Sequence, residues 1–408
     1  MMPPLSKYLR RNPARHMVEP DVPAAGFRQA VVIPASGELL YLPATLAALA
    51  LNPPAILAET LVLAVVNNAA GASPERKEDN FQMLRLLRQR AIPGQEKLRL
   101  YWIDAAAEGR ELQHGVGDAR KTGMDAVLPF LDWAADPLIL CLDADTLVEP
   151  GYLAAFKAAF AAHPEAAGAV MRFVHQTGTD AAEEAAIRAY ENYMEHYVRM
   201  LSDAGCPYAY HAMGSAMACR ASAYLRAGGM KPRNAGEDFY FLQSLRKLGT
   251  VIPVDASTVH PSARPSDRVP FGTGATVRKL TAGNRQYCHH ADIFAMLKVL
   301  YRTVDTADVE ILRALPLRFQ ETLPDPGIIF LQESGFGAAW AKITANTPAT
   351  TGHLLAAFHT WFDAFRVMKF VHFCEERFPD RFQRDMSGLE GINLPAEADS
   401  IRSHPTRA

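Results

Sequence analysis

The sequence has no apolar run long enough to cross a membrane. The longest apolar region of its 408 residues, at 42–66, is interrupted by Asn52, Pro53, Pro54 and Glu59. A membrane span requires about 18 uninterrupted apolar residues. The sequence therefore predicts no transmembrane segment and leaves only peripheral contact with a membrane open.

The sequence also has almost no net charge. Its 42 Lys and Arg residues nearly balance 44 Asp and Glu residues. Nucleic acids and anionic membranes are bound mainly by strongly basic surfaces. The charge balance therefore gives no reason to expect nucleic acid as a partner, and the composition is that of an ordinary globular protein.

Cysteines are few, and their spacing shows no pairs. The five are Cys141, Cys206, Cys219, Cys288 and Cys374. An odd, scattered set argues against a disulfide framework and against a structural zinc site. The first 17 residues are basic but lead into no continuous apolar segment, which argues against a signal peptide. These absences together predict a cytoplasmic protein with reduced thiols.

What the sequence does contain, from about residue 28, is an alternation of short apolar strands and helices. Strands are predicted at 29–34, 61–66, 98–103 and 137–142, and helices at 42–51, 80–90 and 120–133. This order predicts an α/β fold with a mainly parallel central sheet and helices on both faces. Ligands of such sheets bind beyond the carboxyl ends of the strands. Pro34, Asn67 and Asp143 each follow such an end, so they should share one opening.

The pattern changes near residue 275. Residues 1–27 are an N-terminal extension, 28–274 form the α/β domain, and 275–408 are a helical region with a frayed tail. Helices are predicted in the last region at 291–303 and 353–372. The sequence does not determine whether the helical region binds an acceptor or forms a homodimer.

The fourth strand ends in two acidic residues, Asp143 and Asp145, separated by one alanine. Three interpretations are open. The pair can be incidental acids at a solvated strand end. It can be the D-x-D-x-T motif of a phosphohydrolase of the haloacid-dehalogenase type, in which Asp143 would be the nucleophile. It can also hold a divalent cation that binds the phosphates of a substrate.

The surrounding motifs favour the third interpretation. The phosphohydrolase motif normally lies on the first strand of its domain, whereas at least three strands precede Asp143 here. Over about residues 28–270 the chain resembles the family 2 glycosyltransferases of the GT-A fold, and five segments match in the family's order. They are VVIPASGE (31–38), AVVNNA (64–69), GVGDARKTGMD (115–125), LDADTLVEPGYL (142–153) and AGEDFYFLQSLRKLG (235–249).

The resemblance implies a metal-dependent, inverting transfer of a sugar from a nucleoside diphosphate to a hydroxyl group. Asp145 would be the main ligand of Mn²⁺ or Mg²⁺, and Asp143 would contact the metal, a metal-bound water or the ribose. His260 would complete the metal shell. Asp238 would be the general base, with Glu237 as the alternative. Asp145 and Asp238 should therefore face the same opening.

The resemblance also implies a nucleotide site. Its expected residues are Pro34, Ala35, Glu38 and Asn67 for the base and ribose, Arg120 and Lys121 for the base or a phosphate, and Arg264 and Arg268 on a loop that closes over the diphosphate. The family commonly has Asp where this chain has Asn67, so the nucleotide stays open, with UDP favoured and GDP as the alternative. The acceptor can be a glycan, a lipid-linked sugar or a small metabolite. A noncatalytic sugar-nucleotide-binding protein is a further alternative.

Overall fold

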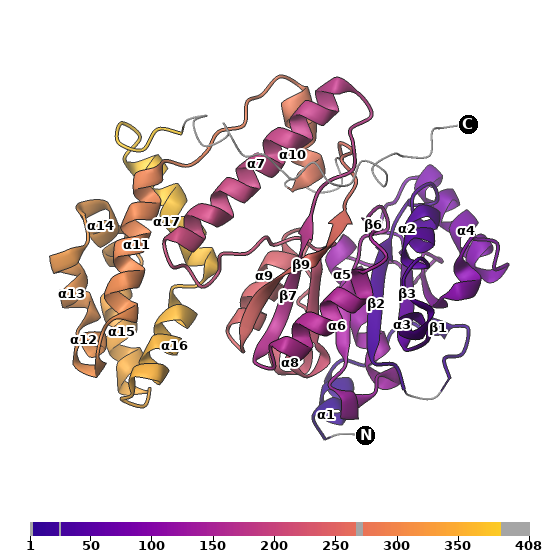
Figure 1. Cartoon of the computed structure of the whole chain (residues 1–408), viewed down its shortest axis with the longest axis horizontal. Coiled ribbons are helices and arrows are strands. Elements are labelled where there is room, and N and C mark those ends of the chain that lie inside the picture. The colour runs from indigo at the N-terminus through magenta and orange to yellow at the C-terminus, as the bar shows by residue number, and fades with distance from the viewer. Residues whose placement is uncertain (1–2, 24–25, 267–271, 385–408) are drawn as a thin grey trace. The chain divides into compact units, whose positions relative to one another are not determined.

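The chain folds into two compact units, which are described separately. The computed structural model describes residues 3–23, 26–266 and 272–384 (Figure 1). Of the described residues, the sheet unit contains 3–23, 26–184, 212–266 and 272–278, and the helical unit contains 185–211 and 279–384. Arg268 lies outside the described residues. The 185–211 segment, expected in the α/β domain, is thus grouped with the helical unit.

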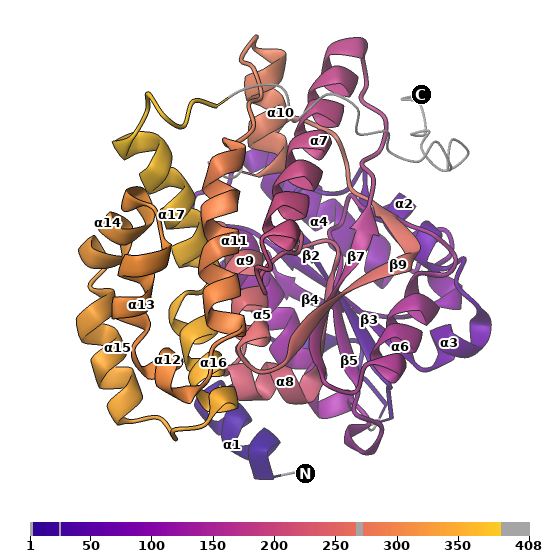
Figure 2. The ribbon, with the colours of Figure 1, turned by 60° about the vertical axis from the view of Figure 1, so that its left-hand side comes forward.

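The centre of the sheet unit is a nine-stranded sheet with the order β1-β4-β3-β2-β5-β8-β7-β9-β6. Its strands are β1 (Val18–Glu19), β2 (Gln29–Ala35), β3 (Thr60–Asn67), β4 (Arg99–Ala105), β5 (Leu138–Cys141), β6 (Leu147–Val148), β7 (Ala166–Phe173), β8 (Met217–Arg220) and β9 (Thr250–His260). The strands fan out with the twist typical of such sheets (Figure 2).

The sheet is parallel over most of its length. Strand β2 pairs in parallel with β3 and β5, β3 with β4, and β7 with β9. Strand β8 runs antiparallel to both of its neighbours, and the two-residue strands β1 and β6 pair antiparallel at the edges. Because β8 reverses the direction twice, β2, β5 and β9 all point the same way. The predicted α/β fold with a mainly parallel sheet is confirmed.

Helices cover both faces of this sheet. The helices of the unit are α1 (Pro3–Arg11), α2 (Leu42–Leu49), α3 (Pro54–Ala58), α4 (Pro74–Arg88), α5 (Gly115–Val127), α6 (Tyr152–Ala162), α8 (Ala221–Ala227) and α9 (Glu237–Arg246). Two further helices, α7 (Ala181–Asp203) and α10 (Thr273–Thr281), continue into the helical unit. Every residue of β2 and β3 is buried, as expected for parallel strands covered on both sides.

The faces can be assigned from side chains. Gly123 of α5 packs against Val32 and Val65, and a side chain of α9 contacts Gly168 on the same face of the sheet. Arg220 points to the other face, where its guanidinium stacks on Phe160 of α6 at 5.1 Å from the ring centroid. Helices α5 and α9 therefore share one face, and α6 covers the opposite one.

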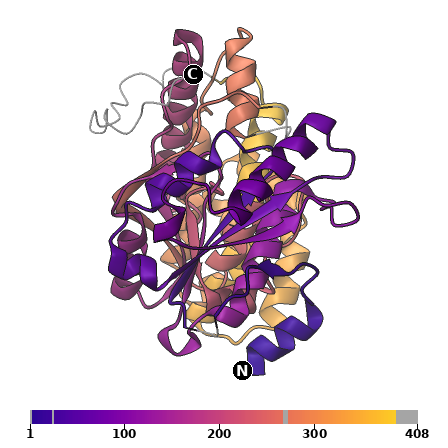
Figure 3. The same ribbon diagram turned by 90° about the vertical axis from the view of Figure 1, so that its right-hand side faces the viewer.

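The N-terminal extension is part of the sheet unit rather than a separate arm. Helix α1, at the end marked N in Figure 3, buries Leu5 and Tyr8. The Tyr8 hydroxyl donates a 2.7 Å hydrogen bond to Asp125 of α5, and the Tyr224 hydroxyl of α8 donates one of 2.6 Å to the same carboxylate. This shared acceptor fixes α1 against α5 and α8.

The helical unit is built around aromatic side chains. Its helices beyond α10 are α11 (Ala291–Asp305), α12 (Val309–Arg313), α13 (Leu315–Thr322), α14 (Asp325–Glu333), α15 (Phe336–Ala345), α16 (Thr351–Trp361) and α17 (Ala364–Arg377). Phe336, Trp340 and Phe358 are almost fully buried and contact one another as a cluster of rings. Among the described residues, no helix is long and apolar enough to span a membrane.

Three of the predicted helices differ by more than two residues from the helices in the structure. Helix α4 begins at Pro74 because Ser73 caps it, its hydroxyl accepting a hydrogen bond from the Arg76 N–H. Helix α5 begins at Gly115 because the Asp118 carboxylate accepts hydrogen bonds from two N–H groups before the first turn. The single helix predicted at 353–372 is wrong, since Asp363 caps a new helix and divides the segment into α16 and α17.

Candidate active site

Charged residues from distant parts of the chain meet at the carboxyl ends of the strands in the sheet unit. Asp143 and Asp145 follow β5, and Glu38 follows β2. Arg264 follows β9, whose direction matches that of β5. These side chains form two clusters, each centred on one arginine, which are called the Arg120 cluster and the Arg264 cluster.

The Arg120 cluster joins the two acidic motifs. The Arg120 guanidinium on α5 binds Asp143 through Nη2 and Glu237, the first residue of α9, through Nη1. The Arg120 side chain is only 4% exposed and that of Glu237 only 3%. Burial alone would lower the pKa of Arg120, but the carboxylates of Asp143, Glu237 and Asp238 raise it above its usual value. The arginine is therefore a permanently charged link.

Two glycines leave space for close contacts in and near the Arg120 cluster. A Cβ atom at Gly214 would collide with the guanidinium of Arg120. Likewise, a Cβ atom at Gly117 in the first turn of α5 would collide with the backbone of Arg233, in the loop before α9. Both glycines thus allow close approach of backbone to its neighbours, a use for which only glycine is suited.

Asp238, beside Glu237, has a pKa well above the usual value for an aspartate. Burial is the largest cause that raises its pKa, the nearby Glu237 carboxylate raises it further, and Arg120 opposes both, with a result of about 6. Its Oδ1 accepts a 2.7 Å hydrogen bond from the Phe239 N–H in the first turn of α9. A carboxylate with a pKa of about 6 is well placed to accept a proton near neutral pH.

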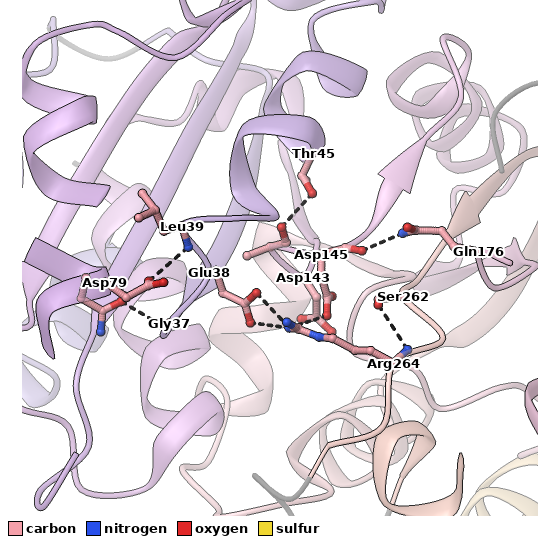
Figure 4. A network of polar contacts seen from close by, with 12 residues as sticks. Gly37, Glu38, Leu39, Thr45, Asp79, Asp143, Asp145, Gln176, Ser262 and Arg264 are labelled. Carbon is pink, nitrogen blue, oxygen red and sulfur yellow. Dashed lines mark hydrogen bonds and ion pairs between the residues drawn. The ribbon is translucent and has the colours of Figure 1, made fainter. Parts of the chain in front are cut away.

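The Arg264 cluster joins the segments that follow β2, β5 and β9, and its side chains point toward one another (Figure 4). Nη2 of Arg264 is 2.7 and 2.8 Å from the two carboxylate oxygens of Glu38 and 2.7 Å from Oδ2 of Asp145. The guanidinium also stacks on Tyr41, 4.0 Å from the ring centroid. Glu38 is almost fully buried, while Asp145 and Arg264 are each 20% exposed. Burial would lower the pKa of Arg264, but Asp145 and Glu38 raise it.

Hydrogen bonds to the backbone hold the acidic loop in place (Figure 4). Thr45 donates a 2.8 Å bond to the Ala144 carbonyl oxygen. The Gln176 side-chain amide donates to the carbonyl oxygens of Asp145, at 2.8 Å, and His260, at 2.7 Å. The segments after β5 and β9 are thus tied together independently of the charged side chains.

The expected nucleotide residues of the first two strand tips are buried. Pro34 and Ala35 lie within β2, and Asn67 is the last residue of β3. The side-chain amide of Asn80 on α4 donates to the Asn67 carbonyl oxygen at 3.0 Å, and its Oδ1 accepts from the Gly37 N–H at 2.9 Å. Asn80 therefore fixes the backbone of both strand tips next to Glu38.

Two expected site residues point elsewhere. Lys121 follows Arg120 on α5, and consecutive helical residues point about 100° apart. Its ammonium pairs with Asp125 at 2.6 Å, on the side facing α1. The His260 ring is fully buried, with Nδ1 2.9 Å from the Val174 carbonyl oxygen and Nε2 3.7 Å from Glu149. The structure thus brings neither residue into the two arginine clusters.

Sequence reasoning missed several contributors. Tyr41 and Gln176 belong to no motif, and the sequence predicts for Asn80 only that a helix begins there. Gly214 likewise lies in none of the five matched segments. Each of these residues acts across a separation of at least 13 positions, so no local pattern reveals the contact.

The donor set of the Arg264 cluster suits a hard divalent cation. Three carboxylate oxygens of Glu38 and Asp145 converge on one point, which is the nitrogen of Arg264. Carboxylate oxygens are preferred ligands of Mg²⁺ and Mn²⁺. Within residues 3–23, 26–266 and 272–384, no group of three or more His, Cys, Asp or Glu side chains could hold a metal. A cation here would therefore need further oxygens, from water or from a substrate.

Comparison with known proteins identifies the segment that carries these motifs. Residues 138–272 match the family described as Glycosyl transferase family group 2. This match includes Asp143, Asp145, Asp238 and Arg264, and it confirms the family predicted from the sequence. No curated protein matches the chain.

Two of the solved structures that match the chain do so at low sequence identity and low TM-score. S. aureus TarS 1–349 in complex with UDP-GlcNAc is 14% identical, with a TM-score of 0.38, over 72% of this chain and 67% of that one. Glucosyl-3-phosphoglycerate synthase from Mycobacterium tuberculosis, in complex with Mn²⁺, UDP and phosphoglyceric acid, is 15% identical. Its TM-score is 0.37, over 63% of this chain and 77% of that one.

Proposed function

Residues 138–272 belong to the family 2 glycosyltransferases, and from this premise we propose that the protein moves a sugar from a nucleoside diphosphate to a hydroxyl acceptor, with inversion and with the help of a divalent cation. One observation carries the proposal. The Arg120 guanidinium binds both Asp143 and Glu237, so the strand-end acids and the acidic start of α9 lie on either side of a single side chain.

The leaving group determines which charges the reaction needs. Departure of a nucleoside diphosphate leaves negative charge on the phosphates, and a bound Mg²⁺ or Mn²⁺ would supply a Lewis acid there. Asp145, supported by Glu38, would hold the cation. Arg264 and Arg268 would pair with phosphate oxygens, because a guanidinium can bind two of them at once. UDP is the favoured nucleotide.

The acceptor hydroxyl must lose its proton when it attacks the anomeric carbon. Asp238 is the proposed base because its raised pKa, about 6, lets it hold a proton once transferred and still be ionised at neutral pH. Glu237 is bound by Arg120 and buried, which suits it to positioning α9 rather than to exchanging protons. Arg120 likewise occupies an oxygen of Asp143, an arrangement that disfavours Asp143 as a phosphohydrolase nucleophile.

The test is a binding and hydrolysis assay with defined nucleotides. Calorimetric titration of the full chain with UDP and with GDP, with and without Mn²⁺, should show binding that requires the cation. A panel of UDP- and GDP-sugars without acceptor should then identify the donor by slow hydrolysis. Absence of nucleotide binding in both cation conditions would contradict the proposal, and cation-independent binding without any sugar release would indicate a noncatalytic binding protein.

A further inference from the structure

The arrangement around Arg264 suggests how the site is neutralised before any ligand binds. We infer that Glu38 and Asp145 together form the divalent-cation site and that the Arg264 guanidinium fills it until the cation displaces it. Glu38, expected only in the nucleotide pocket, thereby becomes a metal ligand. This inference rests on the proposed function for the identity of the cation. The arrangement of Glu38, Asp145 and Arg264 does not depend on that function.

The geometry is that of a cation and its ligands. Nη2 of Arg264 lies 2.7 to 2.8 Å from three carboxylate oxygens, two of Glu38 and one of Asp145 (Figure 4). An ordinary surface ion pair places one nitrogen near one or two oxygens of a single carboxylate. Here two carboxylates from the loops after β2 and β5 point at the same nitrogen, so a second positive charge at that place would compete directly with it.

The burial of Glu38 explains why a positive charge is needed at the position of Arg264 Nη2. The Glu38 side chain is 5% exposed. A buried carboxylate without a counter-charge is strongly disfavoured unless it takes up a proton. Without metal, Arg264 supplies part of that counter-charge. Once a divalent cation has bound, the same carboxylates no longer need the guanidinium.

The Arg264 side chain can be displaced from its carboxylates more easily than the Arg120 side chain. Arg264 is 20% exposed and also stacks on Tyr41. Arg120 is 4% exposed and bound on two nitrogens. A released Arg264 would carry a free guanidinium fork next to the cation, where the two phosphates of a nucleoside diphosphate bind it bidentately. Cation and diphosphate would then strengthen each other's binding by linkage.

The experiment measures Mn²⁺ binding without nucleotide, by the loss of the free-Mn²⁺ signal in electron paramagnetic resonance. Arg264→Gln should bind Mn²⁺ about 10- to 100-fold more tightly than the wild type, because the competing charge is gone. Lys279→Gln removes an exposed charge of α10 and should leave the affinity unchanged. The double variant Glu38→Gln/Arg264→Gln should lose the gain, since one of the two carboxylates is neutral.

Several outcomes would overturn the inference. Equal or weaker Mn²⁺ binding in Arg264→Gln would do so, as would a gain that survives in the double variant. If Arg264→Gln does not fold, Arg264→Lys decides: its ammonium keeps the charge, so it should stay within about threefold of the wild type, and a gain of tenfold or more would contradict displacement. Failure of UDP binding in wild-type protein with Mn²⁺ would instead contradict the proposed function, and the Mn²⁺ titration would still test Arg264.

Discussion

The Arg120 and Arg264 clusters have the same composition and different surroundings. Each consists of one arginine between a buried glutamate and a partly exposed aspartate from different segments of the chain. In the first, the arginine itself is buried, at 4% exposure, and it is bound to a separate carboxylate through each terminal nitrogen. In the second, the arginine is 20% exposed, and a single nitrogen serves both carboxylates.

The difference indicates separate roles for similar side chains. Removing one partner from a buried ion network leaves a charge that neither water nor protein neutralises, so such a network acts as a fixed support. A partly exposed network can exchange one cation for another at lower cost. We therefore interpret the Arg120 cluster as the support of the base side of the site and the Arg264 cluster as the exchangeable cation side.

The largest expected effect tests the base side. Asp238→Asn should reduce sugar transfer by about 10² to 10⁴-fold, because the acceptor hydroxyl loses its proton acceptor. UDP binding with Mn²⁺ should stay within a few-fold of the wild type, since the cation side is unchanged. The measurement is kcat/KM together with calorimetry. A variant that transfers sugar at the wild-type rate would remove Asp238 as base.

The pH profile of the wild type gives the same test without a mutation. The raised pKa of Asp238, about 6, means that its base form is lost as the pH falls through 6. The value of kcat/KM should therefore be constant above pH 7 and fall about tenfold per pH unit below 6. A profile that stays flat down to pH 5 would show that another group accepts the proton.

The next prediction compares how much each of the two arginines contributes to the free energy of unfolding. Arg120→Gln should lower the apparent free energy of unfolding by about 3–5 kcal/mol, because it leaves Glu237 buried and unpaired. Arg264→Gln also leaves a buried carboxylate, Glu38, but it should cost less, because water reaches the partly exposed position of the guanidinium and Asp145. Urea denaturation followed by circular dichroism measures both. Arg318→Gln, which breaks an exposed pair with Glu321, serves as the control and should change stability by at most about 0.5 kcal/mol. Equal costs for Arg120 and Arg264 would remove the distinction.

A substitution at Gly214 tests whether the Arg120 cluster depends on the space that this glycine leaves. Gly214→Ala should destabilise the protein by about 1–3 kcal/mol, because the new Cβ atom displaces the Arg120 guanidinium. The matched control is Gly337→Ala on α15, where a Cβ atom meets nothing within 4 Å. That substitution should be neutral or stabilising by up to about 1 kcal/mol. Similar thermal midpoints for the two alanine variants would mean that Arg120 can move freely.

The smallest effect is a gain. Folding raises the pKa of Asp238, so ionised Asp238 disfavours the folded state at pH values above 6, and that cost disappears as the pH falls toward 4. Asp238→Asn should therefore stabilise the protein by about 1–2 kcal/mol at pH 8 and by little at pH 4. Thermal unfolding at the two pH values tests this. A destabilised variant at pH 8 would indicate that Arg120 overcompensates the carboxylates.

The strands and the family were predictable because their signals are local. The apolar runs that become β2, β3 and β5 are continuous, and the acidic residues follow them directly in the sequence. The start of α9 was likewise marked by Gly236, Glu237 and Asp238. Local geometry brings parallel strand ends to one edge of the sheet, so the residues after them had to share an opening.

What the sequence determined, then, was which residues lie at that opening. The tertiary structure decided which of them pair. Arg120 and Lys121 are adjacent and both cationic, yet α5 directs one into the site and the other to Asp125. His260 is the last residue of β9 and Arg264 lies four residues further on, yet only the arginine side chain meets Asp145. Pairing depends on helix phase, burial and space left by residues such as Gly214, and these arise only when distant segments pack together.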